Sequence, residues 1–359
     1  MELHRLITDE HVVRAFMQHR RLTRAELAAE IGISKPTAGE SVRRLAERGL
    51  VVDTGERTPG GRGRGRVGSY YALSPDAGTA LAVTIAPEGV AGERIDAYGD
   101  TVARAERKLS RPASPAAVTS ALRDVAAEAG AGARLAVVSA ADPVDRRTGR
   151  LVHLPDAPFL VGDLDPVAIL APYVAAGPGG STTVDNDVNW AARAELEHDP
   201  ALTDFAYLFL GEGLGCAIVS DREVLRGAAG LAGEIADVLT TGPDGRAVRF
   251  IDVFGDLRLR QPDSTAIDVD RLLAAPFAPA IGRAVAGVVA AVVALADPER
   301  IVVGGAWGPA LLGPIREALD RPARPVHVKA AEIAGDAAFA GVRAAALSRL
   351  RSAIVAAVP

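Results

Sequence analysis

The chain of 359 residues contains a single cysteine, Cys216. A lone thiol excludes a framework of intrachain disulfides, and it also excludes a metal site built from several cysteines. Long apolar runs are scarce too. The longest candidate for a membrane span, 284–296, is too short to cross a bilayer. The first residues, MELHRLITDEHVV, lack the basic-then-apolar order of a signal peptide. We therefore expect a cytoplasmic protein without a membrane partner.

Lysine is also rare, since only three of the 40 basic residues are lysines. Together with the many alanines, this bias indicates a GC-rich, bacterial coding sequence before it indicates any function. The charges are distributed unevenly: residues 1–68 hold 13 Lys and Arg against 9 Asp and Glu, and the remainder holds 27 against 36. A basic head on an acidic body is typical of a DNA-binding domain attached to a body that stays off DNA.

Residues 21–52 predict two short helices joined by a tight turn. Thr23 opens a capping box for the first helix. Gly32 suits the sharp turn, because glycine adopts backbone conformations that other residues avoid. Ser34 can cap the second helix, and Pro36 is tolerated in its first turn. This arrangement is typical of a helix-turn-helix, with a first helix over 8–20 packed against it.

The second helix, Ser34 to Leu45, is expected to bury Val42 and Leu45 and to present a polar, basic side to a major groove. The residues of this unit that we expect at DNA are Arg24, Ser34, Lys35, Pro36, Thr37, Glu40, Ser41, Arg43 and Arg44. The basic members would divide between base edges and phosphates.

A segment rich in arginine and glycine, 58–68, lies between two predicted strands at 50–52 and 69–73. Alone it is equally typical of a flexible, solvated loop. Directly after a helix-turn-helix it predicts a wing whose arginines enter a minor groove or bind phosphates. The wing residues expected at DNA are Gly60, Gly61, Arg62, Arg64 and Arg66. The winged helix-turn-helix domain is expected to span residues 1–75.

Strands alternate with helices in two blocks over 76–359, which predicts an α/β body of two lobes with a cleft between them. One lobe should comprise roughly 76–185 with the C-terminal helix, and the other 186–335. A nearly all-apolar stretch, 277–295, predicts a long core helix.

Several motifs follow the winged head in a specific order. They are PVD at 143–145, VDNDVN at 184–189, LGEGLG at 210–215, RGAAGLAGEI at 226–235 and IVVGG at 301–305. This order resembles the ROK family (repressors, open reading frames and sugar kinases), on its repressor branch, from about residue 10 to 350. The resemblance implies an actin-like body of the sugar-kinase type, a sugar pocket in the cleft, and a homodimer or tetramer.

The resemblance also implies sugar-binding residues. Asn186 and Asp187 match residues that bind sugar hydroxyls, and the matching Asp of the family's kinases is the catalytic base. Glu234 matches a sugar-binding Glu, and Asp237 takes the position of a His that contacts sugar and zinc. The alternative for Asp187 is a carboxylate that only caps a helix.

The motifs for zinc and ATP depart from the family pattern. Residues 238–255 contain no Cys or His, so we expect no metal. The first phosphate loop reads TIAPEG at 84–89, where Pro87 removes a backbone donor and Glu88 adds a repelling charge. The second contains Glu212 in place of a small residue. A glutamate opposes phosphate binding, so we expect no ATP, no cofactor and no phosphotransfer.

Two functions from different classes therefore stand side by side. The first is a nucleoid-associated transcriptional regulator, a repressor of sugar or secondary metabolism genes, which binds a palindromic or AT-rich operator as an oligomer and responds to a sugar in the cleft. The second is a sugar kinase with an appended regulatory head. Within the first class, the pocket can also be a remnant, so that the regulator acts without a ligand.

Overall fold

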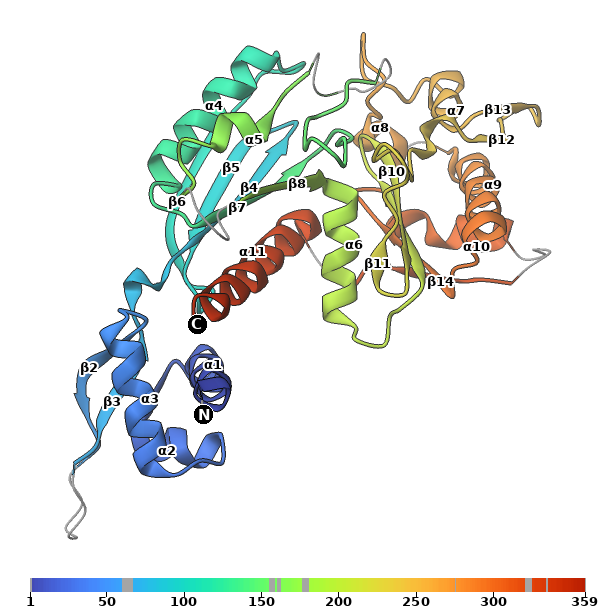
Figure 1. The fold of residues 1–359 in the computed structure, drawn as a ribbon. Coiled ribbons are helices and arrows are strands. Elements are labelled where there is room, and N and C mark those ends of the chain that lie inside the picture. Colours follow the sequence, from blue (N-terminus) through green and yellow to red (C-terminus); the bar gives the residue numbers. More distant parts are fainter. Residues whose placement is uncertain are drawn as a thin grey trace.

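The computed structural model describes residues 2–59, 67–154, 159, 163–175, 181–274, 276–319, 325–333 and 335–358. It shows an N-terminal head and a body of two lobes (Figure 1). The head consists of α1 (Glu2–His19), β1 (Arg21–Thr23), α2 (Arg24–Glu30), α3 (Lys35–Glu47), β2 (Val51–Arg57) and β3 (Ser69–Leu73). Its three strands form an antiparallel sheet in the order β1-β3-β2. The predicted helix-turn-helix and hairpin are both present, and β1 is an additional strand.

The first lobe contains a five-stranded sheet in the order β6-β5-β4-β7-β8. Its strands are β4 (Ala80–Ala86), β5 (Gly89–Ile95), β6 (Thr101–Lys108), β7 (Leu135–Ala140) and β8 (Thr182–Asn186). β4, β7 and β8 run parallel, whereas β4, β5 and β6 form an antiparallel meander. The helices α4 (Pro115–Ala129) and α5 (Pro166–Leu170) pack on one face, and α11 (Ala337–Ala356) packs on the other.

The second lobe repeats this plan with a five-stranded sheet in the order β11-β10-β9-β14-β15. Its strands are β9 (Phe205–Leu210), β10 (Leu214–Ser220), β11 (Glu223–Val224), β14 (Arg300–Gly304) and β15 (His327–Ala330). One face carries α7 (Phe250–Asp256), α9 (Ala278–Ala296) and α10 (Leu312–Ala318). The hairpin β12 (Leu239–Thr241) to β13 (Ala247–Arg249) and α8 (Val269–Ala274) complete the lobe. α6 (Asp187–His198) lies between the lobes beside α11 (Figure 1).

Within the described residues, α9 is the one helix long and apolar enough to cross a membrane. Its buried side, which includes Ile281, Val285 and Val289, packs against Ile301 and Phe254 in the core of the second lobe. The stretch therefore acts as the core helix that the sequence predicts.

The head packs directly on the first lobe, below the C-terminal end of α11 (Figure 1). The apolar core of the head continues into the lobe, because Val12 and Phe16 of α1 belong to the same buried cluster as Leu350 and Ile354 of α11. No long exposed linker separates the two parts, since Ser74 caps a short 3₁₀ turn, Pro75–Ala77, that leads into β4.

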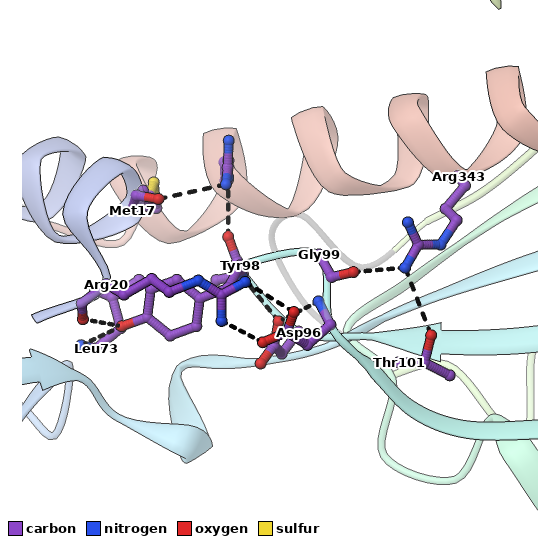
Figure 2. Close-up of polar contacts among 11 residues, drawn as sticks. Met17, Arg20, Leu73, Asp96, Tyr98, Gly99, Thr101 and Arg343 are labelled. Atoms are coloured by element: carbon purple, nitrogen blue, oxygen red, sulfur yellow. Dashed lines mark hydrogen bonds and ion pairs between the residues drawn. The ribbon is translucent and has the colours of Figure 1, made fainter.

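The turn between β5 and β6 joins the head to the body through polar contacts (Figure 2). The Tyr98 hydroxyl donates a hydrogen bond to the carbonyl of Arg20 and accepts one from the Leu73 amide, both at 2.9 Å. Arg20 also forms a two-pronged ion pair with Asp100 and stacks over the Tyr98 ring. From α11, Arg351 donates to the carbonyl oxygens of Ala97 at 2.9 Å and of Met17 at 3.4 Å. We call this set the junction: it links the end of α1, strand β3, the β5–β6 turn and α11.

Candidate functional site

The helix-turn-helix is built by the local signals that its sequence carries. The amide of Glu26 donates to Thr23 Oγ1 at 3.2 Å, and the Glu26 carboxylate accepts from the Thr23 amide at 2.8 Å, which completes the capping box. Gly32 has a φ of +70°, the left-handed conformation that favours glycine. Ser34 caps α3 by accepting the Thr37 amide at 3.2 Å.

The exposed side of α2 and α3 holds most of the predicted DNA contacts. These exposed residues are Arg24, Ser34, Lys35, Pro36, Thr37, Glu40 and Arg43. Arg43 is paired with Glu40 at 2.9 Å and Glu47 at 2.6 Å along α3. Lys35 has no ion-pair partner among the described residues. Lys35 is therefore the basic side chain of α3 that is free to approach a phosphate or a base.

Ser41 and Arg44 lie differently from the prediction that placed them on the DNA-facing side. Ser41 is fully buried and donates a hydrogen bond to Asp9 of α1. Arg44 donates to the two carboxylate oxygens of Asp9, with Nε–Oδ2 at 3.0 Å and an Nη–Oδ1 distance of 2.6 Å. The prediction for Ser41 is wrong, because a buried Asp9 requires donors and both side chains supply them. These two residues hold α3 onto α1.

Three arginines of the head stack on tyrosines, an arrangement that the sequence analysis missed. Arg21 lies 5.1 Å from the centre of the Tyr70 ring, and Arg24 lies 4.9 Å from that of Tyr71. Both tyrosines belong to β3, and Arg20 repeats the pattern at the junction. The sequence shows the closely spaced arginines and the adjacent Tyr70 and Tyr71. It does not show that they stack, because the stacking depends on the pairing of β1 with β3.

The base of the predicted wing is closed by Thr58 and Gly68. The Thr58 amide donates to the Gly68 carbonyl, and the Gly68 amide donates to Thr58 Oγ1, both at 2.9 Å. The predicted contacts Gly60, Gly61, Arg62, Arg64 and Arg66 lie outside the described residues. The described part of the hairpin is therefore the antiparallel pair β2 and β3, closed at Thr58 and Gly68.

The body brings the four predicted sugar-binding residues together at one pocket of about 160 Å³. Asn186, Asp187, Glu234 and Asp237 all line it. Asn186 is the N-cap of α6, because its side chain accepts the Val188 amide at 2.9 Å. Asp187 accepts the same amide at 2.8 Å and also lines the neighbouring cavity of about 700 Å³. Asp187 therefore accepts an amide of α6 and also lines the cleft, and its contact with a sugar stays a prediction.

A fifth polar residue of the pocket, Asp142, was not predicted. It follows β7, lines the same pocket and is 4 % exposed. Burial raises its pKa to about 7, and the charge of Glu234 adds to this shift. Burial likewise raises the pKa of Glu234 to about 7, with a contribution from Asp237. The position after a buried parallel strand was the available signal for Asp142.

The pKa of Asp187 is also raised to about 7, mainly by burial and further by the charges of Asp142, Glu234 and Asp336. A carboxyl group that titrates near neutral pH can accept or donate a proton. Among the described residues, no three His, Cys, Asp or Glu side chains are placed to share a metal ion.

The two loops that the sequence analysis compared with the family's phosphate loops both line the larger cavity. Glu88 in the β4–β5 turn and Glu212 in the β9–β10 turn both line it. Arg111 bridges them, with one Nη at 2.6 Å from Glu88 and the other at 2.6 Å from Glu212. The guanidinium therefore links the two lobes at the larger cavity.

Comparisons with known proteins agree with this architecture. Residues 5–52 match a model described as winged helix-turn-helix DNA-binding, and residues 104–245 match the ROK family. The chain is 31% identical over 185 residues to the bifunctional enzyme NanE/NanK of Brucella melitensis. That match covers 47% of this chain and 36% of the enzyme, so the chain spans about a third of the length of that relative.

Two solved structures show the same fold at low identity. A ROK family transcriptional regulator, a homolog of the E. coli MLC protein, matches 99% of this chain and 98% of its own, with a TM-score of 0.62 and 16% identity. A ROK family glucokinase from Streptomyces griseus, in complex with glucose and AMPPNP, matches 75% of this chain and 99% of its own, with a TM-score of 0.56 and 21% identity. The chain therefore has an N-terminal segment that matches winged helix-turn-helix DNA-binding domains, followed by a two-lobed body that matches the ROK family over residues 104–245 and shares the fold of ROK proteins.

Proposed function

We propose that the protein is a sequence-specific transcriptional repressor that binds operator DNA as a homo-oligomer in the cytoplasm, at the nucleoid. The observation that carries this proposal is the winged head, whose exposed α3 presents Lys35 and Thr37 while the partly buried Asp9–Arg44 pair fixes the helix in place. A recognition helix held rigidly on its scaffold is what base readout in a major groove requires.

The cleft is the proposed site of control by a sugar-like ligand. The pocket at Asn186, Asp187 and Glu234 opens between the two lobes, and the head is fastened to one of them through the junction. A ligand that changes the angle between the lobes would then change the spacing of the two heads of a dimer. Operator binding depends on that spacing, because half-sites lie one helical turn apart or a multiple of it.

The test of DNA recognition is selection from a random pool of duplex DNA with the full-length protein. We expect enrichment of a symmetric motif, and we expect the Lys35→Ala variant to bind this motif more weakly. Recovery of unselected DNA by both proteins would contradict sequence-specific binding.

We further propose that the body does not transfer phosphate from ATP, and that it uses no cofactor. Glu88 and Glu212 line the cavity at the phosphate positions, and Pro87 removes a backbone donor from the first loop. Both carboxylates are bound to Arg111, so neither the loops nor this arginine are free to hold phosphate oxygens.

The alternative, a sugar kinase with a regulatory head, is favoured by Asp187, whose pKa of about 7 suits a general base facing the cleft. The kinase relatives point in the same direction. An assay for ADP release with a panel of hexoses separates the two functions. Our proposal expects no sugar-dependent ADP release, and turnover that is lost in Asp187→Asn would establish the kinase instead.

A further inference from the structure

The pocket beside Asp187 contains carboxyl groups that the protein leaves without partners. Asp142 is 96 % buried, as its exposure of 4 % shows, and no described residue donates a hydrogen bond to its carboxyl group. Glu234 lies within electrostatic range of Asp142 and also accepts no side-chain hydrogen bond from a described residue. Neither residue is among those with polar atoms buried without a partner, so these carboxyl oxygens reach the open space of the pocket, where a ligand can supply donors.

Basic side chains do not offset these carboxyls. Among the described residues that line the pocket there is no Lys, Arg or His. Two other carboxylates of the lining are paired with arginines from outside it: Asp237 binds Arg249 at 3.1 Å, and Glu212 binds Arg111 at 2.6 Å. The pocket is therefore an acidic cavity that lacks cationic groups of its own.

We propose that the ligand of this pocket is a sugar-like molecule with a free ammonium group, a hexosamine in chemical class, and that the ammonium binds between Asp142 and Glu234. This inference rests on the proposed function, which supplies the sugar class, and it adds the charge of the ligand. An ammonium group carries three donors and one positive charge, which match acceptors that the protein does not satisfy. Asn186 and Asp187 are then left to contact hydroxyl groups of the same ligand.

A metal ion is a poorer occupant of the pocket. Within the described residues, no three carboxylate, imidazole or thiol groups converge at metal-binding geometry. A single ammonium needs only two carboxyls that line the same pocket within electrostatic range of each other, and it is bound without the near-ideal geometry that a small divalent ion demands.

The test measures the binding of matched sugars to the full-length protein by calorimetry at pH 7. The probes are glucosamine, mannosamine and galactosamine, each with its N-acetyl counterpart and its parent hexose. We expect at least one free amine to bind about tenfold or more tightly than both neutral forms, since one unit of pKa shift in a pocket carboxyl is worth a factor of ten. Asp142→Asn and Glu234→Gln should each reduce this preference, while the control Asp124→Asn, on the exposed side of α4, should leave it unchanged.

The outcomes separate this inference from the proposed function. Equal or tighter binding of a neutral or N-acetylated sugar would overturn the ammonium assignment and leave a sugar-responsive regulator intact. Binding of no sugar at all would also overturn it. Loss of the proposed function would appear separately, as failure of the same preparation to select a DNA motif.

Discussion

Asp9 shows how a residue outside the recognition helix determines which side chains of that helix are free. Its buried carboxylate accepts hydrogen bonds from Ser41 and Arg44, so both residues serve the packing of the head. The amphipathic pattern of α3 could not reveal this, because a polar residue on a helix resembles a surface residue until its buried partner is known. Lys35 and Arg43 remain on the exposed side, and only Lys35 is without an ion pair among the described residues.

Replacing Arg44 by Ala should therefore destabilise the head before it affects DNA contacts. Asp9 would keep a single donor, Ser41, and the loss of a charged hydrogen-bond pair in a partly buried site costs about 2 kcal/mol. Hydrogen exchange of the α3 amides should accelerate in Arg44→Ala and stay near the wild-type rate in Arg43→Ala. Unchanged protection in Arg44→Ala would show that the pair with Asp9 does not support the helix.

Lys35→Ala should weaken DNA binding through electrostatics. If Lys35 neutralises one phosphate, the slope of log affinity against log salt should fall in magnitude by about 1. Titrations of the selected DNA at several salt concentrations measure this slope. Arg283→Ala removes an exposed arginine of α9 on the body and is the matched control. Equal slopes for wild type and Lys35→Ala would place Lys35 away from the phosphates.

Asp142 makes stability depend on pH in a predictable direction. Its pKa is about 7 in the folded protein, above the 3.8 of an unperturbed aspartate. The folded state therefore holds a proton that the unfolded chain releases near pH 4, and stability falls as the pH rises from about 4 through 7. Asp142→Asn removes this loss, so its advantage over wild type should grow to a few kcal/mol at pH 8. Thermal unfolding at pH 5 and pH 8 checks this, and a difference that does not change with pH would contradict the assignment.

At the scale of elements, local signals predicted the head and most of the body well. The capping box, the Gly32 turn and the Ser34 cap each appear as expected, because these devices act within a few residues. The edge strands β6 and β15 carry weaker local signals. β6 alternates charged and small residues along one edge of its sheet, and β15 is a short edge strand of four residues. Edge strands carry a weak hydrophobic pattern, so only their pairing identifies them.

The candidate sites show the same division between local and distant information. Asn186 and Asp187 stand at a strand-to-helix boundary that the sequence displays directly. The partners of Asp142 and Arg111 could not be predicted from the sequence, because residues on the other lobe, Glu234 and Glu212, determine the surroundings of both. The Arg111 contact with Glu212, for example, joins residues separated by 101 positions.

The β5–β6 turn is the element that couples the head to the body. Tyr98→Phe removes the hydroxyl that joins the Arg20 carbonyl to the Leu73 amide, and each lost hydrogen bond is worth about 1 kcal/mol. Exchange of the Leu73 amide should therefore accelerate about fivefold or more. Tyr70→Phe on the same strand is the control, because its ring stacks on Arg21 outside the junction. A Leu73 amide that exchanges at the wild-type rate in Tyr98→Phe would mean that the hydroxyl does not hold the junction.

At the scale of the whole molecule, two neighbouring cavities lie between the lobes, and the contacts of the head with the body among the described residues are made to the first lobe. Arg111 links the lobes at the larger cavity, and the junction links the head to the first lobe. We propose that a change in the angle between the lobes moves the head, because the short turn Pro75–Ala77 and the junction join the head to the first lobe without a long linker. We propose that the carboxylates of Glu88 and Glu212 disfavour nucleotide binding, so that the cleft binds a regulatory ligand instead.

The most direct test of this account combines thermal stability with operator affinity. Free, N-acetylated and phosphorylated sugars are first screened for an increase in melting temperature, since a ligand at about 100 times its Kd adds roughly 2.7 kcal/mol to the form that binds it. Each sugar that stabilises the protein is then added to a titration of the selected operator. We predict that at least one such sugar changes the operator affinity, and that Asp187→Asn loses this response while retaining DNA binding. Equal operator affinity with and without every sugar that binds would contradict it.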